Sequence, residues 1–263
     1  MGRMRNVWIT RRARCVLREL DCVLDDVYGA PETILENKQD PLDEAIYIIL
    51  SFQTDLDRFK CVWGQLRKAF PTWEDVAQAP IDSVQSIIRA GGLQGQKARI
   101  IKRLLQAVRD YSGSFSLDFL RDIEDGEAER ILTHLPGLSW KAARCILLYS
   151  LDRAVFPVDG NTFRILKRVG VLPASSIYRR RALHDVLQKT VEPARRKSFH
   201  INMVIHGQRT CLPRNPRCCE CVARRICMKR GVPSEIRPAT GVEPQPLSGG
   251  NALTKAGEGG TGA

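Results

Sequence analysis

Lys141 stands where its side chain could act as a nucleophile. The dipeptide Pro136-Gly137 predicts a turn, because proline lacks a backbone N–H and glycine accepts positive φ. Ser139 can cap a helix that starts directly after this turn, so Lys141 falls in the first turn of that helix. The helix dipole disfavours a cation there, so we expect a lowered pKa and an amine that deprotonates readily. A neutral amine forms Schiff bases with sugar or carbonyl carbons.

Asp159 is the second residue that could take part in chemistry, and it follows Lys141 by eighteen residues. A carboxylate that precedes a helical pattern predicts a helix N-cap. The same carboxylate could instead lie opposite Lys141, where it would act as a base or as an electrostatic partner. The residues alone leave both interpretations open.

The turn before Lys141 could also bind an anion. The first N–H groups of a helix have no partner inside the helix and point outward, where a phosphate can sit. Gly137 and Ser139 lie at this place, so we expect them to approach a phosphate. An ordinary connection between two helices has the same signature, because Pro-Gly turns are common.

Four cysteines close together predict a metal centre. Cys211, Cys218, Cys221 and Cys227 are separated by six, two and five residues. Thiolates select an iron–sulfur cluster or zinc. Zinc usually binds two close pairs of cysteines, and only the middle two form such a pair here. The spacing therefore favours a [4Fe–4S] cluster, with zinc as the alternative.

Positive charge gathers in the same part of the sequence. Residues 161–230 contain seventeen Lys or Arg and three acidic residues, whereas residues 1–160 are close to neutral. The net charge of +12 predicts a face that binds a polyanion, with a merely soluble basic surface as the alternative. Arg214 and Arg217, inside the cysteine loop, are suited to grip phosphates.

Apolar residues recur at helical spacing along most of the chain, and no strand-like alternation is evident, so we predict an all-α fold. Asp43 is the expected cap of the second helix, and four further cysteines fall at apolar helical positions, which predicts that they belong to the core: Cys15, Cys22, Cys61 and Cys145. The expected helices lie within residues 1–30 and at Glu44–Phe52, Leu56–Phe70, Trp73–Gln78, Ile81–Arg89, Lys97–Tyr111, Asp118–Ile123, Ala128–His134, Thr162–Val169, Arg181–Val191 and Arg196–Gly207.

The composition also excludes some classes of protein. No apolar run is long enough to span a bilayer, and the N-terminus lacks the apolar segment of a secretory signal. Nine cysteines in such a chain indicate reduced thiols or metal ligands more than disulfides.

These motifs together resemble the helix-hairpin-helix DNA glycosylase superfamily, and within it the endonuclease III branch. The resemblance covers about residues 35–230. It rests on four motifs in the order of the family, of which the cysteine spacing matches the family's [4Fe–4S] loop: Ser51-Phe52-Gln53, Gly92-Leu93, the hairpin with Lys141 and Asp159, and the four-cysteine loop.

The resemblance implies two helical domains with a DNA cleft between them. We expect a six-helix barrel at 35–153, an iron–sulfur domain at 154–230 that packs with an N-terminal helix at 1–34, and a disordered tail at 231–263. The implied partner is double-stranded DNA with a damaged base or an abasic site. We expect the protein to bind it as a monomer and to have no membrane partner. The compartment would be the bacterial cytoplasm at the nucleoid, or a eukaryotic nucleus or mitochondrion.

The implied activity is base excision repair of an oxidised pyrimidine. Lys141 would attack the sugar C1′, expel the flipped base and hold the sugar as a Schiff base before β-elimination. Asp159 would activate the amine or stabilise the sugar cation. Gln53 and Leu93 would fill the gap that the flipped base leaves.

Three departures from the family keep other functions open. Ser139-Trp140 replaces a glycine and a basic residue, Gly160-Asn161 replaces Thr-His, and Phe52 replaces a small residue. The alternatives are a monofunctional glycosylase, a glycosylase for a mismatch or an unusual lesion, and a non-catalytic, structure-selective DNA-binding protein. A cluster-dependent redox sensor has no support in the sequence.

Overall fold

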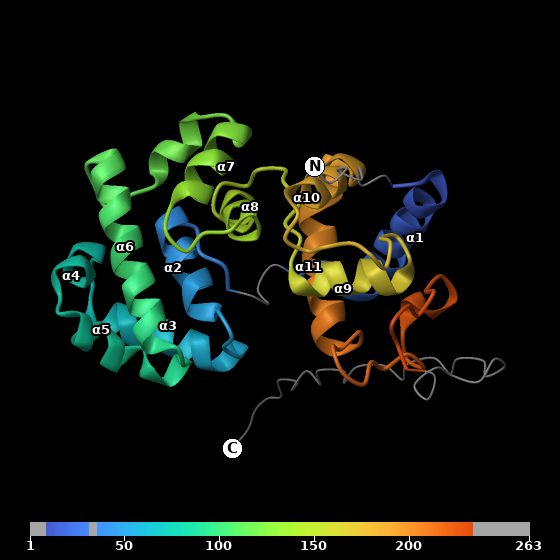
Figure 1. The fold of residues 1–263 in the computed structure, drawn as a ribbon, viewed down its shortest axis with the longest axis horizontal. Coiled ribbons are helices and arrows are strands. Elements are labelled where there is room, and N and C mark those ends of the chain that lie inside the picture. Colours follow the sequence, from blue (N-terminus) through green and yellow to red (C-terminus); the bar gives the residue numbers. More distant parts are fainter. Residues whose placement is uncertain (1–8, 32–35, 234–263) are drawn as a thin grey trace, which may run out of the picture.

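The computed structural model describes residues 9–31 and 36–233, and most of the predicted tail lies outside these ranges. The described chain is helical and has no β-strand, which confirms the predicted all-α class (Figure 1). None of its helices is both long and apolar enough to cross a membrane. The helices are α1 (Arg11–Tyr28), α2 (Pro41–Ser51), α3 (Leu56–Ala69), α4 (Trp73–Gln78), α5 (Ile81–Ile87), α6 (Gln94–Ser112), α7 (Asp125–His134), α8 (Trp140–Tyr149), α9 (Gly160–Val169), α10 (Arg181–Thr190) and α11 (Arg196–Arg209), with 3-10 turns at Arg89–Gly91, Asp118–Asp122, Pro193–Arg195 and Val222–Arg225.

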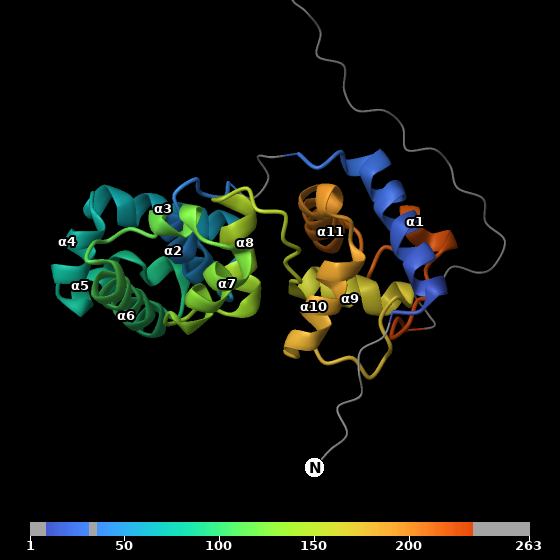
Figure 2. The same cartoon turned by 90° about the horizontal axis from the view of Figure 1, so that it is seen from above.

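The helices pack around two separate hydrophobic cores. Helices α2–α8 surround the first core, and α1 with α9–α11 surrounds the second (Figures 1 and 2). Leu20 and Leu24 of α1 are fully buried in the second core, and apart from residues 9–28 that core comes from residues after 155. We propose that these two helical bundles are the barrel domain and the iron–sulfur domain expected from the sequence.

Helix α2 begins three residues earlier than predicted. Its cap is Asp40, whose Oδ1 accepts hydrogen bonds from the amides of Leu42 and Asp43, both at 2.8 Å. Asp43 is therefore not the cap, and its carboxylate instead accepts from the Trp73 indole at 2.8 Å. Pro41 accounts for the shift, because its fixed φ and missing N–H suit the first position of a helix.

Two predictions about burial are wrong. Cys15, Cys22 and Cys61 are exposed, because each lies on the outer face of an amphipathic helix, whereas Cys145 is buried as predicted. Val232 falls in the predicted disordered tail but is buried, since it packs beside the cysteine loop.

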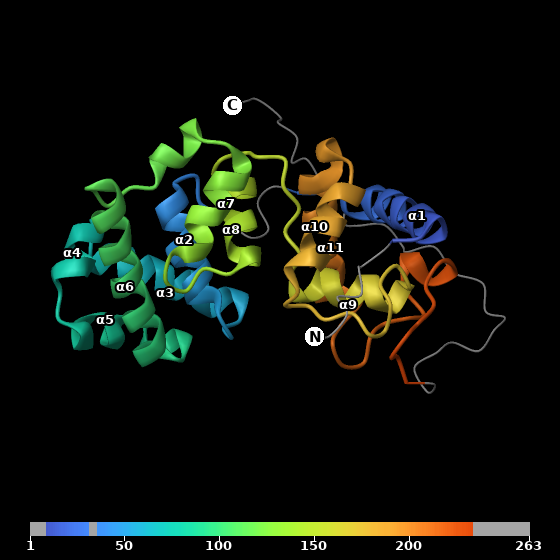
Figure 3. The ribbon, with the colours of Figure 1, turned by 45° about the horizontal axis from the view of Figure 1, so that its top comes forward.

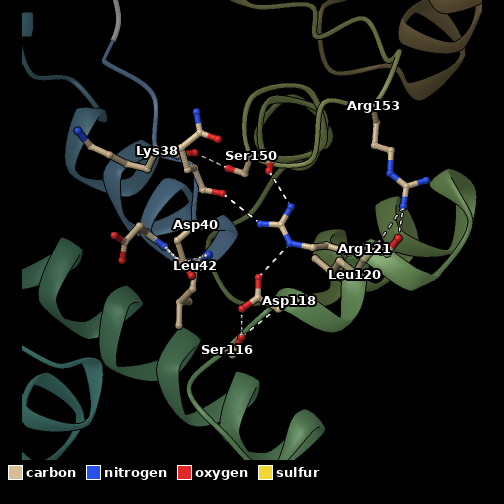
Figure 4. Close-up of polar contacts among 11 residues, drawn as sticks. Lys38, Asp40, Leu42, Ser116, Asp118, Leu120, Arg121, Ser150 and Arg153 are labelled. Carbon is tan, nitrogen blue, oxygen red and sulfur yellow. Dashed lines mark hydrogen bonds and ion pairs between the residues drawn. The ribbon is translucent and has the colours of Figure 1, made fainter.

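Two chain segments connect the bundles, and polar contacts hold both of them. Residues 36–40 lead into α2, and residues 150–159 lead from α8 to α9 (Figure 3). The Ser150 hydroxyl donates to the Lys38 carbonyl at 2.7 Å, so the segments are joined directly (Figure 4). Arg121 donates to one carbonyl in each segment. These contacts fix the end of α8 and thereby the direction in which the chain leaves for α9.

A buried ion pair also links the bundles. Arg144 of α8 is 2% exposed and binds Glu129 of α7 at 3.1 Å and Asp185 of α10 at 2.7 Å. Because α10 belongs to the second core, this guanidinium ties the two bundles together at the middle of α8.

Replacing this arginine should destabilise the protein far more than replacing a surface arginine. Arg144→Met leaves the buried Glu129 without a counter-charge, so we expect the free energy of unfolding to fall by about 3 kcal/mol. Arg130→Met removes an exposed pair with Glu127 and should cost less than about 1 kcal/mol. Urea unfolding measures both variants, and equal small losses would contradict the role of Arg144.

Candidate active site

The hairpin before Lys141 has the predicted local geometry. The Ser139 hydroxyl accepts a hydrogen bond from the Ala142 amide at 3.3 Å and so caps α8. Gly137 has a φ of +81°, and a side chain there would overlap Ile100. Both the backbone conformation and the neighbouring helix therefore require glycine at this position.

Lys141 lies in the first turn of α8 and is partly exposed. Its pKa is raised, first by the nearby Cys145 and then by Asp159, Tyr178 and Glu44, while desolvation acts in the opposite direction. The prediction of a lowered pKa is therefore wrong, because these acidic groups outweigh the helix dipole. The resting amine is protonated at neutral pH and needs a base before it can attack.

Asp159 is both a helix N-cap and an electrostatic neighbour of Lys141, the two alternatives that the sequence left open. Its Oδ1 accepts from the Thr162 amide at 2.7 Å, so it caps α9. It also lies close enough to Lys141 for the two charges to interact. Burial opposes its ionisation, but His200, the Thr162 amide and Lys141 together lower its pKa. An ionised carboxylate thus lies within electrostatic range of the ammonium group.

Asn161 holds the other oxygen of Asp159. Its Nδ2 donates to Oδ2 of Asp159 at 2.8 Å, and its Oδ1 accepts from Arg164 at 2.8 Å. Arg164 also donates to the carbonyls of Gly207 and Cys211, at 2.8 and 2.9 Å. Because a guanidinium can only donate, Arg164 sets the orientation of the Asn161 amide. In the sequence, Asn161 stood out only as a departure from the family's motif. Its position between Asp159 and Arg164 at the start of one helix could have indicated that it contacts both.

Buried and half-buried polar side chains lie near the pair. Burial raises the pKa of Cys145 to about 11 and that of Tyr178 to about 12, and it lowers the pKa of His200 to about 4. All three groups are therefore neutral at physiological pH. Sequence reasoning did not identify Tyr178 or His200 as part of the site, because they come from a loop and a helix distant in the chain.

The four predicted ligands line one hollow beside Arg168: Cys211, Cys218, Cys221 and Cys227. Nη1 of Arg168 lies 3.3 Å from the sulfur of Cys211 and donates to the Leu212 carbonyl at 2.6 Å. Between residues 9 and 233, the described part contains no group of three or more Cys, His, Asp or Glu side chains arranged around a single metal ion. Four thiols around one hollow fit an iron–sulfur cluster, whose ligands stand farther apart than those of one zinc ion. Cys219 is exposed and does not line the hollow.

Gln53 and Leu93 lie at the tips of two turns and share an unusual conformation. Both are exposed, and their φ angles are +50° and +51°, which residues other than glycine rarely adopt. The turns are neighbours, since the Thr54 hydroxyl donates to the Gly91 carbonyl at 2.6 Å. Strained backbone at exposed positions is typical of functional sites.

The remaining predicted DNA-binding residues are also exposed, in two further places. Gly137 and Ser139 lie at the hairpin, and Arg214 and Arg217 lie in the cysteine loop. The structure therefore brings together the catalytic candidates and, separately, the four cysteines, whereas the candidate DNA contacts are spread over three surface elements.

Trp140 of the hairpin packs against an arginine from the other bundle. The Arg181 guanidinium lies 4.3 Å from the centre of the Trp140 ring, and its Nε is 3.5 Å from Asp185. Arg181 thus brings a cation to the place where the family's hairpin carries its own basic residue. A cation over an indole is attracted by the ring, which holds the guanidinium in place.

Removing the amide of Asn161 should change how Asp159 titrates. The hydrogen bond favours the charged carboxylate, so Asn161→Leu raises the pKa of Asp159. A carboxyl whose pKa is lowered by folding stabilises the protein above its unfolded-state pKa, and that stability is lost as pH falls through the folded-state pKa. The stability difference between wild type and variant should therefore be largest at neutral pH and shrink in acid. Carboxyl NMR titration and urea unfolding test this, and a pH-independent difference would contradict it.

Known proteins share both sequence and fold with this chain. Residues 46–189 match the family model described as HhH-GPD superfamily base excision DNA repair protein. The candidate DNA glycosylase At3g47830 of Arabidopsis thaliana is 29% identical over 178 residues, which are 67% of this chain and 60% of that protein. Endonuclease III of Sulfolobus acidocaldarius is 28% identical over 156 residues, which are 59% of this chain and 66% of that protein.

A solved structure described as a non-covalent endonuclease III–DNA complex has the same fold. Its TM-score is 0.70 at 21% sequence identity, and the match covers 82% of this chain and 95% of that chain. The family model covers more than half of the chain, and the helical fold agrees with it. The protein belongs to the HhH-GPD superfamily of base excision DNA repair proteins.

Proposed function

We propose that this protein is a DNA glycosylase with AP lyase activity, which removes a damaged base and cleaves the abasic site that results. The observation that supports this most strongly is that the amine of Lys141 and the ionised carboxylate of Asp159, each at the start of a helix, lie within electrostatic range of each other. Such a pair can form a covalent bond to a sugar carbon and stabilise the charge that develops there.

Asp159 has two tasks in the proposed reaction. It takes the proton of the Lys141 ammonium group as Nζ bonds to C1′, and it stabilises positive charge on the sugar as the C1′–N bond breaks. The base leaves with the electron pair of the broken bond and takes up a proton from water.

Strand cleavage follows from the same covalent bond. The sugar ring opens to a protonated Schiff base on Lys141, which makes the C2′ proton acidic. Loss of that proton breaks the C3′–O bond and releases the 3′ phosphate, and water then hydrolyses the Schiff base to free the lysine. No metal or cofactor is needed in any of these steps.

Binding of duplex DNA would use all the exposed elements around the site. A base must be flipped out of the stack before it can react, and a damaged or mispaired base costs the least energy to extract. The gap would be filled by side chains from the two strained turns, and phosphates would be held by the hairpin and the cysteine loop; the residues are Gln53, Leu93, Gly137, Ser139, Arg214 and Arg217.

The loop cysteines would hold a [4Fe–4S] cluster with an architectural role. When bound, the cluster links four thiolates of one loop and so makes that loop rigid. Arg168 and Arg164 of α9 already bind the carbonyls of this loop. Helix α9, which Asp159 caps, therefore supports both the cluster loop and the catalytic carboxylate.

A glycosylase for a mismatched or unusual base is a second candidate. Asn161 contacts Asp159 directly and replaces the family's histidine, so the surroundings of the base differ from those in oxidised-pyrimidine enzymes. A panel of duplexes with oxidised pyrimidines, mismatches or alkylated bases, incubated with excess enzyme, distinguishes the two candidates.

Borohydride trapping tests the proposed activity. Borohydride reduces a Schiff base to a stable bond, so we expect a covalent protein–DNA adduct on a duplex with an abasic site. Lys141→Gln should abolish the adduct, whereas Lys189→Gln, at an exposed position on α10, should leave it intact. Equal trapping by wild type and Lys141→Gln would contradict the assignment. No adduct with wild type, but normal binding, would end the lyase assignment and leave a monofunctional glycosylase or a DNA-binding protein.

The Trp140–Arg181 contact predicts a phosphate-binding role for Arg181. Arg181→Met should reduce the slope of log affinity against log salt by about 1, the effect of losing one phosphate contact. Arg103→Met, at an exposed position on α6, should leave the slope unchanged. Fluorescence anisotropy with an undamaged duplex measures both variants. An unchanged slope for Arg181→Met would show that its charge does not reach DNA.

A further inference from the structure

Lys97 of α6 is a buried ammonium group that the proposed chemistry does not use. It is 1% exposed, and desolvation lowers its pKa. Its Nζ donates to the Leu50 carbonyl at 2.8 Å, the Thr54 hydroxyl at 2.6 Å and the Gly91 carbonyl at 2.9 Å. These three bonds account for all three N–H protons of an ammonium group, so Lys97 is protonated although no carboxylate among its described contacts balances its charge.

The three acceptors belong to the two turns that carry Gln53 and Leu93. Leu50 and Thr54 flank the first turn, and Gly91 lies two residues before Leu93. The Thr54 hydroxyl connects the two turns a second time, because it accepts a hydrogen bond from Lys97 and donates one to the Gly91 carbonyl at 2.6 Å. One nitrogen atom therefore joins both turns at their bases.

The strained backbone of the turns explains why such a link is needed. Gln53 and Leu93 have left-handed φ angles, which would relax if the turns were free. Three acceptors that converge on one point suit the compact ammonium group of lysine better than the planar fork of arginine. Hydrogen bonds to a charged donor in a buried place are also stronger than neutral ones.

We propose that Lys97 is a positioning residue for base extraction, which holds Gln53 and Leu93 at a fixed separation so that both side chains enter the duplex together. The inference rests on the proposed function, because it assumes that these residues fill the gap. Lys97 itself touches neither DNA nor the reacting atoms. A pre-arranged pair of side chains enters the duplex without first having to be ordered.

The test uses Lys97→Met, which keeps the length of the side chain and removes its donors. The matched control is Lys102→Met on the same helix, because Lys102 also donates to two backbone carbonyls, those of Ala77 and Ala79, away from both turns. The probe is a duplex with a tetrahydrofuran abasic analogue and 2-aminopurine opposite it, whose fluorescence reports entry of side chains into the gap. The comparison is the same duplex without the analogue.

We expect wild type and Lys102→Met to change the fluorescence and to prefer the abasic analogue over the intact duplex. Lys97→Met should show no fluorescence change, and its preference for the abasic analogue over the intact duplex should fall about tenfold. The reason is that two side chains must then be ordered when the protein binds. Its affinity for intact duplex should stay within about twofold of wild type, because phosphate contacts are unaffected. Thr54→Val, which removes the shared hydroxyl, should change both readouts in the same direction and provides the test if Lys97→Met does not fold.

Two results would overturn the inference. The first is an unchanged fluorescence signal and preference in Lys97→Met and Thr54→Val, and the second is an equal loss of affinity for both duplexes. Neither readout depends on Lys141, so a failed borohydride experiment with intact gap filling would reject the proposed activity and leave the role of Lys97 standing.

Discussion

The electrostatic pairing of Lys141 and Asp159 requires that two helices from different hydrophobic cores begin at the same place. The body of α8 is buried in the first core, and Val158, directly before Asp159, is buried in the second. Only nine residues lie between the last residue of α8 and Asp159, so the direction of this segment decides whether the two side chains come near each other. Ser150, Arg121 and the buried Arg144 fix that direction at the side of the first bundle.

Much of the fold and of the site was predictable because local chemistry decides it. The Pro136-Gly137 turn, the Ser139 cap and the Asp159 cap depend on neighbouring residues, and each has the geometry expected. The spacing of the four cysteines likewise indicated that they would share one place, and they line one hollow. The start of α2 was misplaced because two carboxylates, Asp40 and Asp43, were both plausible caps and only the position of Pro41 distinguishes them.

Features that depend on distant residues could not be predicted. The pKa of Lys141 is raised first by Cys145, one turn along the same helix, and then by Asp159, Tyr178 and Glu44. These last three converge on Lys141 from other elements, and no local pattern shows that convergence. The arginine over Trp140 comes from α10, so the loss of a basic residue from the hairpin had no visible compensation in the sequence. The link between the two strained turns through Lys97 is hidden for the same reason.

The proposed activity depends on a covalent bond between Lys141 and the sugar. Mass spectrometry of the borohydride-reduced adduct, after digestion of protein and DNA, identifies the modified residue directly. We expect a sugar remnant on Lys141 and on no other lysine. A remnant on the N-terminal amine or on a different lysine, with Lys141 unmodified, would contradict it.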